Sequence, residues 1–198
     1  MSNSGVPRKG CLVVISAPSG CGKTTVVEKL LASHPEWQRS ISATTRAPRG
    51  KERDGQDYFF LSRGVFEKKI ARGEFLEYAE VHGQYYGTPR AFVEEAFQEG
   101  KTVILAIDVQ GMKKVRAAAG GMPLVTIFLE PPSFEILKER LVHRGTDAAA
   151  EIQRRVLTAE KEMQEARHFE HRVINRDLDR AVQEVGSIIE NFLSERRK

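Results

Sequence analysis

The sequence predicts an α/β protein with a parallel sheet flanked by helices, and three observations support this class. The first apolar run, at 12–15, is continuous, as is typical of a parallel strand that is covered on both faces. Similar runs recur at 102–107 and 124–129, and segments with helical spacing separate them. A glycine-rich turn follows the first run and opens directly into a helix at Lys23. Strands that alternate with helices in this way favour a doubly wound core.

The turn after the first strand has the spacing of a phosphate-binding loop. Gly22, Lys23 and Thr24 match the pattern GxxxxGK(S/T), and Ala17 replaces its first glycine. Gly20 and Gly22 allow N–H groups to approach an anion at a helix N-terminus. We expect Lys23 to reach the terminal phosphates of a nucleoside triphosphate and the Thr24 hydroxyl to bind Mg²⁺, with a chance glycine-rich turn as the alternative. The residues expected around ATP are Ala17, Pro18, Ser19, Gly20, Cys21, Gly22, Lys23, Thr24 and Thr25.

Length and charge limit the classes of function. A chain of 198 residues suits one α/β domain with inserted sub-regions. The net charge of +4 favours anionic ligands, but interspersed charges are ordinary on a soluble surface, so we expect no nucleic-acid partner. No apolar stretch has the length of a membrane span and no signal core is present near residue 1, so we expect no membrane partner and a cytoplasmic location.

The cysteines and histidines indicate a reducing compartment and no metal site. Cys11 lies in the first strand and Cys21 in the loop, so a disulfide between them would distort the loop. Cys21 also lies at a helix N-terminus, where its pKa could be lowered, and its sensitivity to oxidation is left open. His168 and His171 have no third ligand at a suitable spacing, so we expect a structural role for them.

The remaining elements are predicted from local signals. The segment 40–89 is rich in Gly, Arg and Tyr and is interpreted as an insertion, with strands in SISATTR, DYFFL and FLEYAEV and a helix near 65–71. Further helices are expected at 92–97, from the N-cap Ser133 to about 143, and after Thr146. The chain should close with a strand at 172–175 and a helix marked by Val182, Val185, Ile189 and Phe192.

Asp108 is a candidate for chemistry because it ends the strand predicted at 102–107. Ligands of open parallel sheets bind at the carboxyl ends of the strands. We therefore expect Asp108 beside the phosphate loop.

Two neighbouring arginines differ in their place on the helix after Thr146. Arg155 lies at the border of the apolar face, so we expect it to project toward a cleft, whereas Arg154 lies almost opposite that face. With Arg140 and Arg144, Arg155 would form a basic cluster for a transferring phosphoryl group. A solvated helix face is the alternative.

Several blocks of the chain together resemble the guanylate kinases. The loop APSGCGKTT is followed, in the order and spacing of that family, by SISATTRAPR, DYFF, EFLEYAEVHGQYYGTP, IDVQG, ERLVHRGTD and VINRDL. The family uses Ala or Gly at the position of Ala17. The resemblance covers residues 10–192 and implies a core of 10–40, 91–139 and 158–192, a GMP-binding region at 41–90 and a lid at 140–157.

The resemblance implies a phosphotransferase that converts ATP and GMP, and also dGMP, to diphosphates in purine nucleotide metabolism. Lys23, Arg144 and Arg155 would be catalytic, with Mg²⁺ as the cofactor. Glu77 would read guanine, because one carboxylate can accept from the adjacent N1–H and N2–H₂ groups. Asn175 would lie near the adenine of ATP. The implied GMP-binding residues are Ser42, Arg46, Arg49, Tyr58, Glu77, Tyr86, Thr88 and Asp108.

Alternatives remain open for single residues and for the whole chain. Glu77 could be a half-exposed strand residue. Ala106 replaces the first acidic residue of the D-x-D pattern found in many relatives, so a duplicated acidic role at this strand end is in doubt. An interaction module without catalysis is disfavoured by the intact Lys23 and Thr24 and by both lid arginines. A kinase that acts on another phosphorylated acceptor is disfavoured by Glu77, Ser42 and Thr88 together. Homo-oligomer formation is left open.

Overall fold

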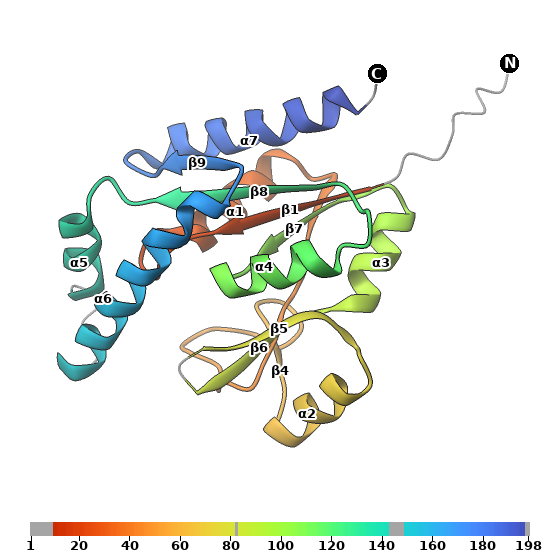
Figure 1. Ribbon diagram of the computed structural model, residues 1–198, viewed down its shortest axis with the longest axis horizontal. Coiled ribbons are helices and arrows are strands. Elements are labelled where there is room, and N and C mark those ends of the chain that lie inside the picture. The colour runs from red at the N-terminus through yellow and green to blue at the C-terminus, as the bar shows by residue number, and fades with distance from the viewer. Residues whose placement is uncertain (1–9, 82, 143–148, 197–198) are drawn as a thin grey trace, which may run out of the picture. The chain divides into compact units, whose positions relative to one another are not determined.

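The computed structural model describes residues 10–81, 83–142 and 149–196, and it shows two sheets flanked by helices (Figure 1). One sheet has five strands in the order β2-β7-β1-β8-β9, and the other has four in the order β4-β3-β6-β5. The strands are β1 (Cys11–Ser16), β2 (Trp37–Arg39), β3 (Ala43–Thr44), β4 (Phe59–Phe60), β5 (Phe75–Val81), β6 (Gln84–Pro89), β7 (Thr102–Ala106), β8 (Leu124–Glu130) and β9 (His171–Ile174). The helices are α1 (Lys23–Ser33), α2 (Arg63–Ala71), α3 (Arg90–Gln98), α4 (Val109–Ala118), α5 (Phe134–Val142), α6 (Ala149–Gln164) and α7 (Leu178–Glu195), and a 3₁₀ turn follows α6 at Glu165–His168.

The chain divides into two compact units. The first unit comprises Met1–Leu12, Glu36–Leu105 and Gln110–Leu124, and the second comprises Val13–Pro35, Ala106–Val109 and Val125–Lys198. The four-stranded sheet, with α2 and α3, belongs to the first unit. The helices α1, α5, α6 and α7 belong to the second.

In the first unit, α2 packs on the small sheet through aromatic side chains. Ser62 caps α2 by accepting from the N–H of Val65. Phe66 is fully buried, and its ring stacks against Phe75 at 4.3 Å and against Tyr85 at 5.3 Å between centroids. Aromatic stacking of this kind adds to the burial of apolar area, so it holds α2 against one face of the sheet.

In the second unit, α1 packs against α7. Val26, Val27 and Leu30 of α1 are fully buried, as their helical spacing predicts. At Gly186 of α7 the two helices lie close, because a Cβ there would be in ordinary van der Waals contact with Leu30, at 3.7 Å. Asp177 caps α7 by accepting from Arg180 N–H at 2.9 Å. The apolar face of α1 thus fixes the helix that begins at the phosphate loop.

The predicted α/β class is confirmed, but local sequence patterns do not indicate β2, β6 or α4. The helix α4 follows β7 directly, and its side chains Met112 and Val115 are buried. Within the described residues, none of the helices combines the length and the apolar character that crossing a bilayer requires.

Candidate functional site

The phosphate loop lies between β1 and α1, and two glycines set its shape. Gly20 and Gly22 have φ angles of 87° and 88°, in the left-handed region that favours glycine. A Cβ at Gly22 would lie 2.9 Å from Asn175 Nδ2, and one at Gly20 would lie 3.1 Å from Leu141. The left-handed backbone therefore favours glycine at both positions, and at Gly22 a Cβ would also displace Asn175, in agreement with a loop that presents N–H groups to an anion.

Lys23 begins α1, and its side chain reaches the segment that follows β7. Its ammonium group donates to the carbonyl oxygen of Ile107 at 2.9 Å. Asp108, which is half-buried, comes next in the chain, and both Lys23 and Asp108 act electrostatically on the same carboxylate, Glu162. The structure thus places Asp108 beside the phosphate loop, where strand ends bind ligands in open parallel sheets.

The helix α6 contacts the phosphate loop at Ser19. Arg155 is half-buried, and its Nη2 donates to Ser19 Oγ at 2.9 Å, whereas Arg154 is exposed. Both positions agree with the orientation that helical spacing predicts. Arg140 lies near enough to the loop to act on the thiol of Cys21. Arg144, which the sequence predicts as catalytic, lies outside the described residues.

Glu162 is a loop contact that the sequence analysis does not find. Its carboxylate, on α6, lies near the Ser19 N–H, which favours the ionised form. Burial raises its pKa to about 7, against the charge of Lys23 and with the help of Asp108. In the described part of the chain, its buried Oε2 has no hydrogen-bond partner. One feature of the sequence could have pointed to Glu162: it comes seven residues after Arg155, and residues at this spacing share a helix face.

The sequence leaves the direction of the Cys21 pKa open, and the fold raises this pKa. The side chain is fully buried, and its Sγ donates to the carbonyl oxygen of Leu129 at 3.5 Å. Burial raises the pKa of the thiol to about 12, although the charge of Arg140 opposes this shift. Loss of solvation outweighs the effect of the helix N-terminus, so Cys21 lacks the thiolate character on which oxidation depends.

Asn175 follows β9 and stabilises the phosphate loop directly. Its buried side-chain Nδ2 donates to the carbonyl oxygen of Cys21 at 2.7 Å. Its backbone N–H donates to Glu130 O at 2.8 Å, which continues the pairing of β8 with β9. The amide is therefore a structural contact of the loop, and its proximity to adenine stays a prediction.

In the first unit, a bulge in β5 decides on which face of the small sheet Glu77 lies. Phe75 pairs with Pro89 and Glu77 with Thr88, so β5 advances by two residues while β6 advances by one. Because neighbouring residues of a strand point to opposite faces, Glu77 lies on the face opposite Phe75. There the Thr88 hydroxyl donates to Glu77 Oε1 at 2.7 Å, and both side chains are buried.

Arginine and tyrosine side chains form a cluster in the same unit. The guanidinium of Arg46 donates twice to the carboxylate of Glu52, at 2.9 Å each, and lies 5.3 Å from the centre of the Tyr58 ring. The rings of Tyr58 and Tyr86 meet edge to face at 6.0 Å. Arg49 N–H also donates to Glu52, at 2.7 Å. Burial alone would raise the pKa of Glu52, but these hydrogen bonds hold it below its ordinary value.

Glu52 is a second residue that the sequence analysis does not find. It holds both predicted arginines, and its position six residues after Arg46 carries no periodic signal, because the pairing depends on the path of a turn. Ser42 immediately precedes β3, and its carbonyl oxygen accepts from Phe59 N–H at 2.9 Å. The structure therefore brings the predicted Ser42, Arg46, Arg49, Tyr58 and Tyr86 to neighbouring positions of one unit.

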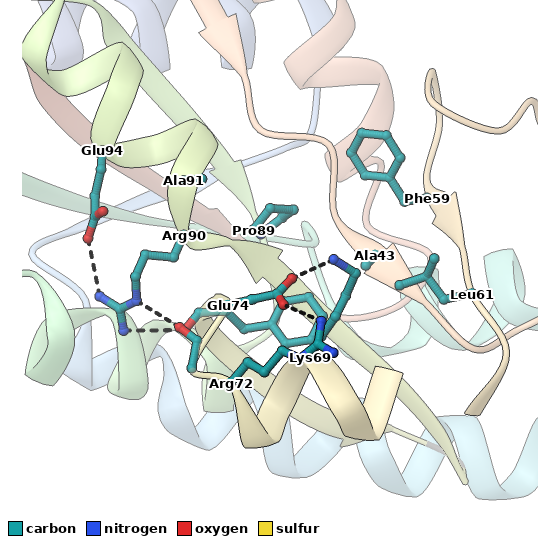
Figure 2. Close-up of a pocket in the computed structure, with 12 residues that line it drawn as sticks. Ala43, Phe59, Leu61, Lys69, Arg72, Glu74, Pro89, Arg90, Ala91 and Glu94 are labelled. Atoms are coloured by element: carbon teal, nitrogen blue, oxygen red, sulfur yellow. Dashed lines mark hydrogen bonds and ion pairs between the residues drawn. The ribbon is translucent and has the colours of Figure 1, made fainter. Parts of the chain in front are cut away.

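A cavity of about 420 Å³ lies on the other face of the small sheet (Figure 2). Phe75 and Pro89 line the cavity. The register of β5 and β6 places these two residues on one face of the sheet and Glu77 and Thr88 on the other face. Its charged wall residues are paired with one another, for example Lys69 with Glu74 at 2.6 Å. None of the predicted site residues lines this cavity, so it is distinct from the Glu77 face.

The oxygen donors near Lys23 suit Mg²⁺. The Thr24 hydroxyl is exposed at the start of α1, and Asp108 supplies a carboxylate. Among the residues that the structure describes, His, Cys, Asp and Glu form no group of three or more that could hold a metal. A small number of oxygen donors is typical of Mg²⁺ sites in which substrate phosphates complete the coordination.

The fold and the loop define a class, the P-loop proteins that bind nucleotide phosphates. Comparisons with known proteins identify the family. The family model described as guanylate kinase matches residues 9–192. The guanylate kinase of Synechocystis sp. is 45% identical over 181 residues, which cover 91% of this chain and 94% of that protein. The guanylate kinase of Clostridioides difficile is 42% identical over 182 residues, which cover 92% and 88%.

A solved structure agrees with these sequence relatives. The crystal structure of guanylate kinase from Anaplasma phagocytophilum matches with a TM-score of 0.76 at 31% identity, covering 92% of this chain and 86% of that one. A gluconokinase from Sinorhizobium meliloti matches with a TM-score of 0.51 at 18% identity, which shows the fold alone. The chain belongs to the guanylate kinase family, and it is a phosphotransferase.

Proposed function

We propose that the protein transfers the γ-phosphoryl group of ATP to GMP, giving ADP and GDP. One observation carries the choice of acceptor: a buried carboxylate, Glu77, beside the Thr88 hydroxyl on one face of the small sheet. Guanine presents N1–H and N2–H₂ side by side, so this carboxylate can accept from both, whereas adenine offers no such pair. The names of the family and of the relatives support the same reaction.

On the ATP side, the phosphate loop and Lys23 bind the phosphates. We assign the stabilisation of charge on the transferred group to Lys23, Arg155 and Arg144, because fixed cations at the reacting phosphorus lower the barrier without reorganisation. The Thr24 hydroxyl would hold Mg²⁺, which when bound neutralises charge on the phosphate oxygens. Asp108 supplies a second oxygen donor beside the loop, and Asn175 is assigned to the adenine end.

On the GMP side, Arg46 and Arg49 suit a dianionic phosphate. A planar guanidinium can donate two parallel hydrogen bonds, as Arg46 does to Glu52 in this structure. Glu52 therefore keeps the guanidinium oriented as a fork. Tyr58 and Tyr86 add phenolic donors, and the Ser42 hydroxyl adds a contact to the base.

The transfer needs no general base. The attacking oxygen belongs to the GMP phosphate, which is already anionic near neutral pH. Catalysis then consists of positioning the two phosphates and stabilising the charge in transfer. We also expect dGMP to be accepted and the reaction to take place in the cytoplasm, where Cys11 and Cys21 stay as the buried thiols seen here.

A coupled assay of ADP release tests the function. ATP and Mg²⁺ are supplied with GMP, dGMP, AMP, CMP or UMP as the single acceptor. We expect turnover with GMP to exceed turnover with the other ribonucleotides by at least about 100-fold. Equal turnover with AMP would refute the assignment of guanine recognition to Glu77.

A further inference from the structure

One arginine of the first unit carries a buried donor that is not paired. Arg39 is the last residue of β2 and is half-buried. Its Nε is buried and has no hydrogen-bond partner among the described residues. In the same part of the chain, none of the ion pairs involves Arg39. Most buried donors in folded proteins are paired, because an unmet donor is costly, so this position calls for an explanation.

The pairing of β2 fixes where the Arg39 side chain projects. Arg39 is in register with Ile104 of the parallel strand β7, and Ser40 N–H donates to the Ile104 carbonyl oxygen at 3.0 Å. Side chains two residues apart on a strand lie on the same face, so Arg39 shares a face with the buried Trp37. The guanidinium therefore starts from the covered face of β2, at the carboxyl end of a parallel strand. Open sheets bind their ligands at this end.

The segments that carry Arg39 and Tyr58 meet in the first unit. The carbonyl oxygen of Ser42 accepts from Phe59 N–H at 2.9 Å. Arg39 precedes this hydrogen bond by three residues on one segment, and Tyr58 precedes it by one residue on the other. The charge of Arg39 acts on the Tyr58 phenol, and the guanidinium of Arg46 lies 5.3 Å from the centre of the same ring. Arg39 thus borders the cluster of arginines and tyrosines in this unit.

Positive charge exceeds negative charge in the group formed by Arg39, Arg46, Arg49 and Glu52. The Glu52 carboxylate is already engaged, because it accepts two hydrogen bonds from Arg46 at 2.9 Å each and one from Arg49 N–H at 2.7 Å. A single carboxylate balances only one of three guanidinium groups, so two positive charges of the group remain. A phosphate monoester carries about two negative charges near neutral pH, and its oxygens accept readily from guanidinium N–H groups. The group therefore suits a phosphate in both charge and hydrogen bonding.

We propose that Arg39 binds the phosphate of the acceptor nucleotide, as a third guanidinium beside Arg46 and Arg49. The proposal rests on the assignment of this unit to GMP. The phosphate would supply an acceptor for the unpaired Nε and negative charge for the unbalanced group. Replacing Arg39 therefore has two opposite consequences: a phosphate contact is lost, and the protein without nucleotide is freed of an unmet buried donor.

Arg39→Met tests the first consequence, because methionine keeps an apolar stem and removes the charge. Binding of GMP and of guanosine is measured by NMR titration in the absence of ATP. We expect the Kd for GMP to rise about 10- to 100-fold, and the Kd for guanosine, which lacks the phosphate, to change by less than about 2-fold. Arg39→Lys keeps the charge but not the planar fork, so its Kd for GMP should lie between those of wild type and Arg39→Met.

Arg72→Met is the matched control for the loss of one positive charge. Arg72 belongs to the same unit, its side chain is 72% exposed, and it lines the cavity on the other face of the small sheet. Its Kd for GMP should stay within about 2-fold of wild type. An equal rise in this control and in Arg39→Met would show a general effect of charge and overturn the proposal.

Urea unfolding without nucleotide tests the second consequence. We expect the midpoint of Arg39→Met to equal or exceed that of wild type, because the variant no longer buries an unmet donor. A lower midpoint or a failure to fold would assign Arg39 a structural role and overturn the proposal. Unchanged GMP binding, or equal losses of GMP and guanosine binding, would overturn it as well.

The outcome for the proposed function is read from wild type alone. Wild type that binds GMP but releases no ADP with ATP would refute the transfer reaction and leave the comparison of Arg39 variants valid. Wild type that binds GMP no more tightly than guanosine would refute the phosphate site, and with it both proposals.

Discussion

Replacing Glu77 by glutamine removes one acceptor from the guanine site while leaving the local packing in place. Glu77 is only 6% exposed, and its Oε1 accepts from the Thr88 hydroxyl at 2.7 Å. The glutamine Oε1 can still accept from that hydroxyl, so we expect the variant to fold. Against guanine, however, the amide presents an N–H₂ where the carboxylate presents an oxygen. One charge-assisted hydrogen bond is lost, and two donors are left facing each other in a buried site.

The free energies of these two losses set the expected change in selectivity. A hydrogen bond to a charged group contributes about 1.5–3 kcal/mol, and an unmet buried donor costs about 1–3 kcal/mol. Their sum is about 3 kcal/mol or more, which corresponds to a roughly 100-fold or greater decrease in kcat/KM for GMP. AMP, which lacks the donor pair, should lose much less.

The assay compares kcat/KM for GMP, AMP and IMP at saturating ATP. IMP has N1–H but lacks the 2-amino group, so its loss on Glu77→Gln should be smaller than the loss for GMP. Glu80→Gln on the same strand is the matched control, because Glu80 is exposed. A Glu77→Gln variant that keeps the wild-type ratio of GMP to AMP would refute the assignment of guanine recognition to this carboxylate.

Three further predictions concern the loop, the pH dependence of stability and the core. Lys23→Met removes a cation from the phosphate site and should lower kcat by about 100-fold or more in the ADP-release assay. Lys29→Met, at a half-exposed position on the same helix, should leave kcat unchanged. Near-normal turnover of Lys23→Met would exclude the assignment of Lys23 to the phosphate site. The folded pKa of Glu162 is raised from 4.5 to about 7, so its contribution to stability is full below about pH 4.5 and is lost as the pH rises through about 7. At about 1.4 kcal/mol per pKa unit, Glu162→Gln should gain about 3 kcal/mol relative to wild type between pH 4.5 and 8 in urea unfolding, and a difference that does not change with pH would contradict this. Phe66→Ala should lower the free energy of unfolding by about 3–5 kcal/mol, because Phe66 is fully buried. Phe92→Ala, at a position that is 37% exposed, should change this free energy by less than about 1 kcal/mol. Equal effects of the two substitutions would show that the contact of Phe66 on α2 is not part of the core.

The local sequence determines the phosphate loop and the orientation of Arg155. An apolar strand, two glycines and an amphipathic helix lie within one short segment, so the conformation of the loop depends on neighbouring residues and can be predicted from them. The periodicity of α6 likewise separates the half-buried Arg155 from the exposed Arg154. The family resemblance adds the candidate GMP residues, but only as single positions.

Tertiary structure alone decides which of these positions meet and what their chemistry is. The bulge at Phe75 and Glu77 turns Glu77 to the face of Thr88, and a strand pattern with a strict period of two would have placed it with Phe75. Ser19 and Arg155 are 136 residues apart, so their contact leaves no local signal. The pKa of Cys21 depends on how completely the folded chain removes water from its thiol, because the cost of desolvating a charge depends on all surrounding atoms and not on the residue's place along the chain.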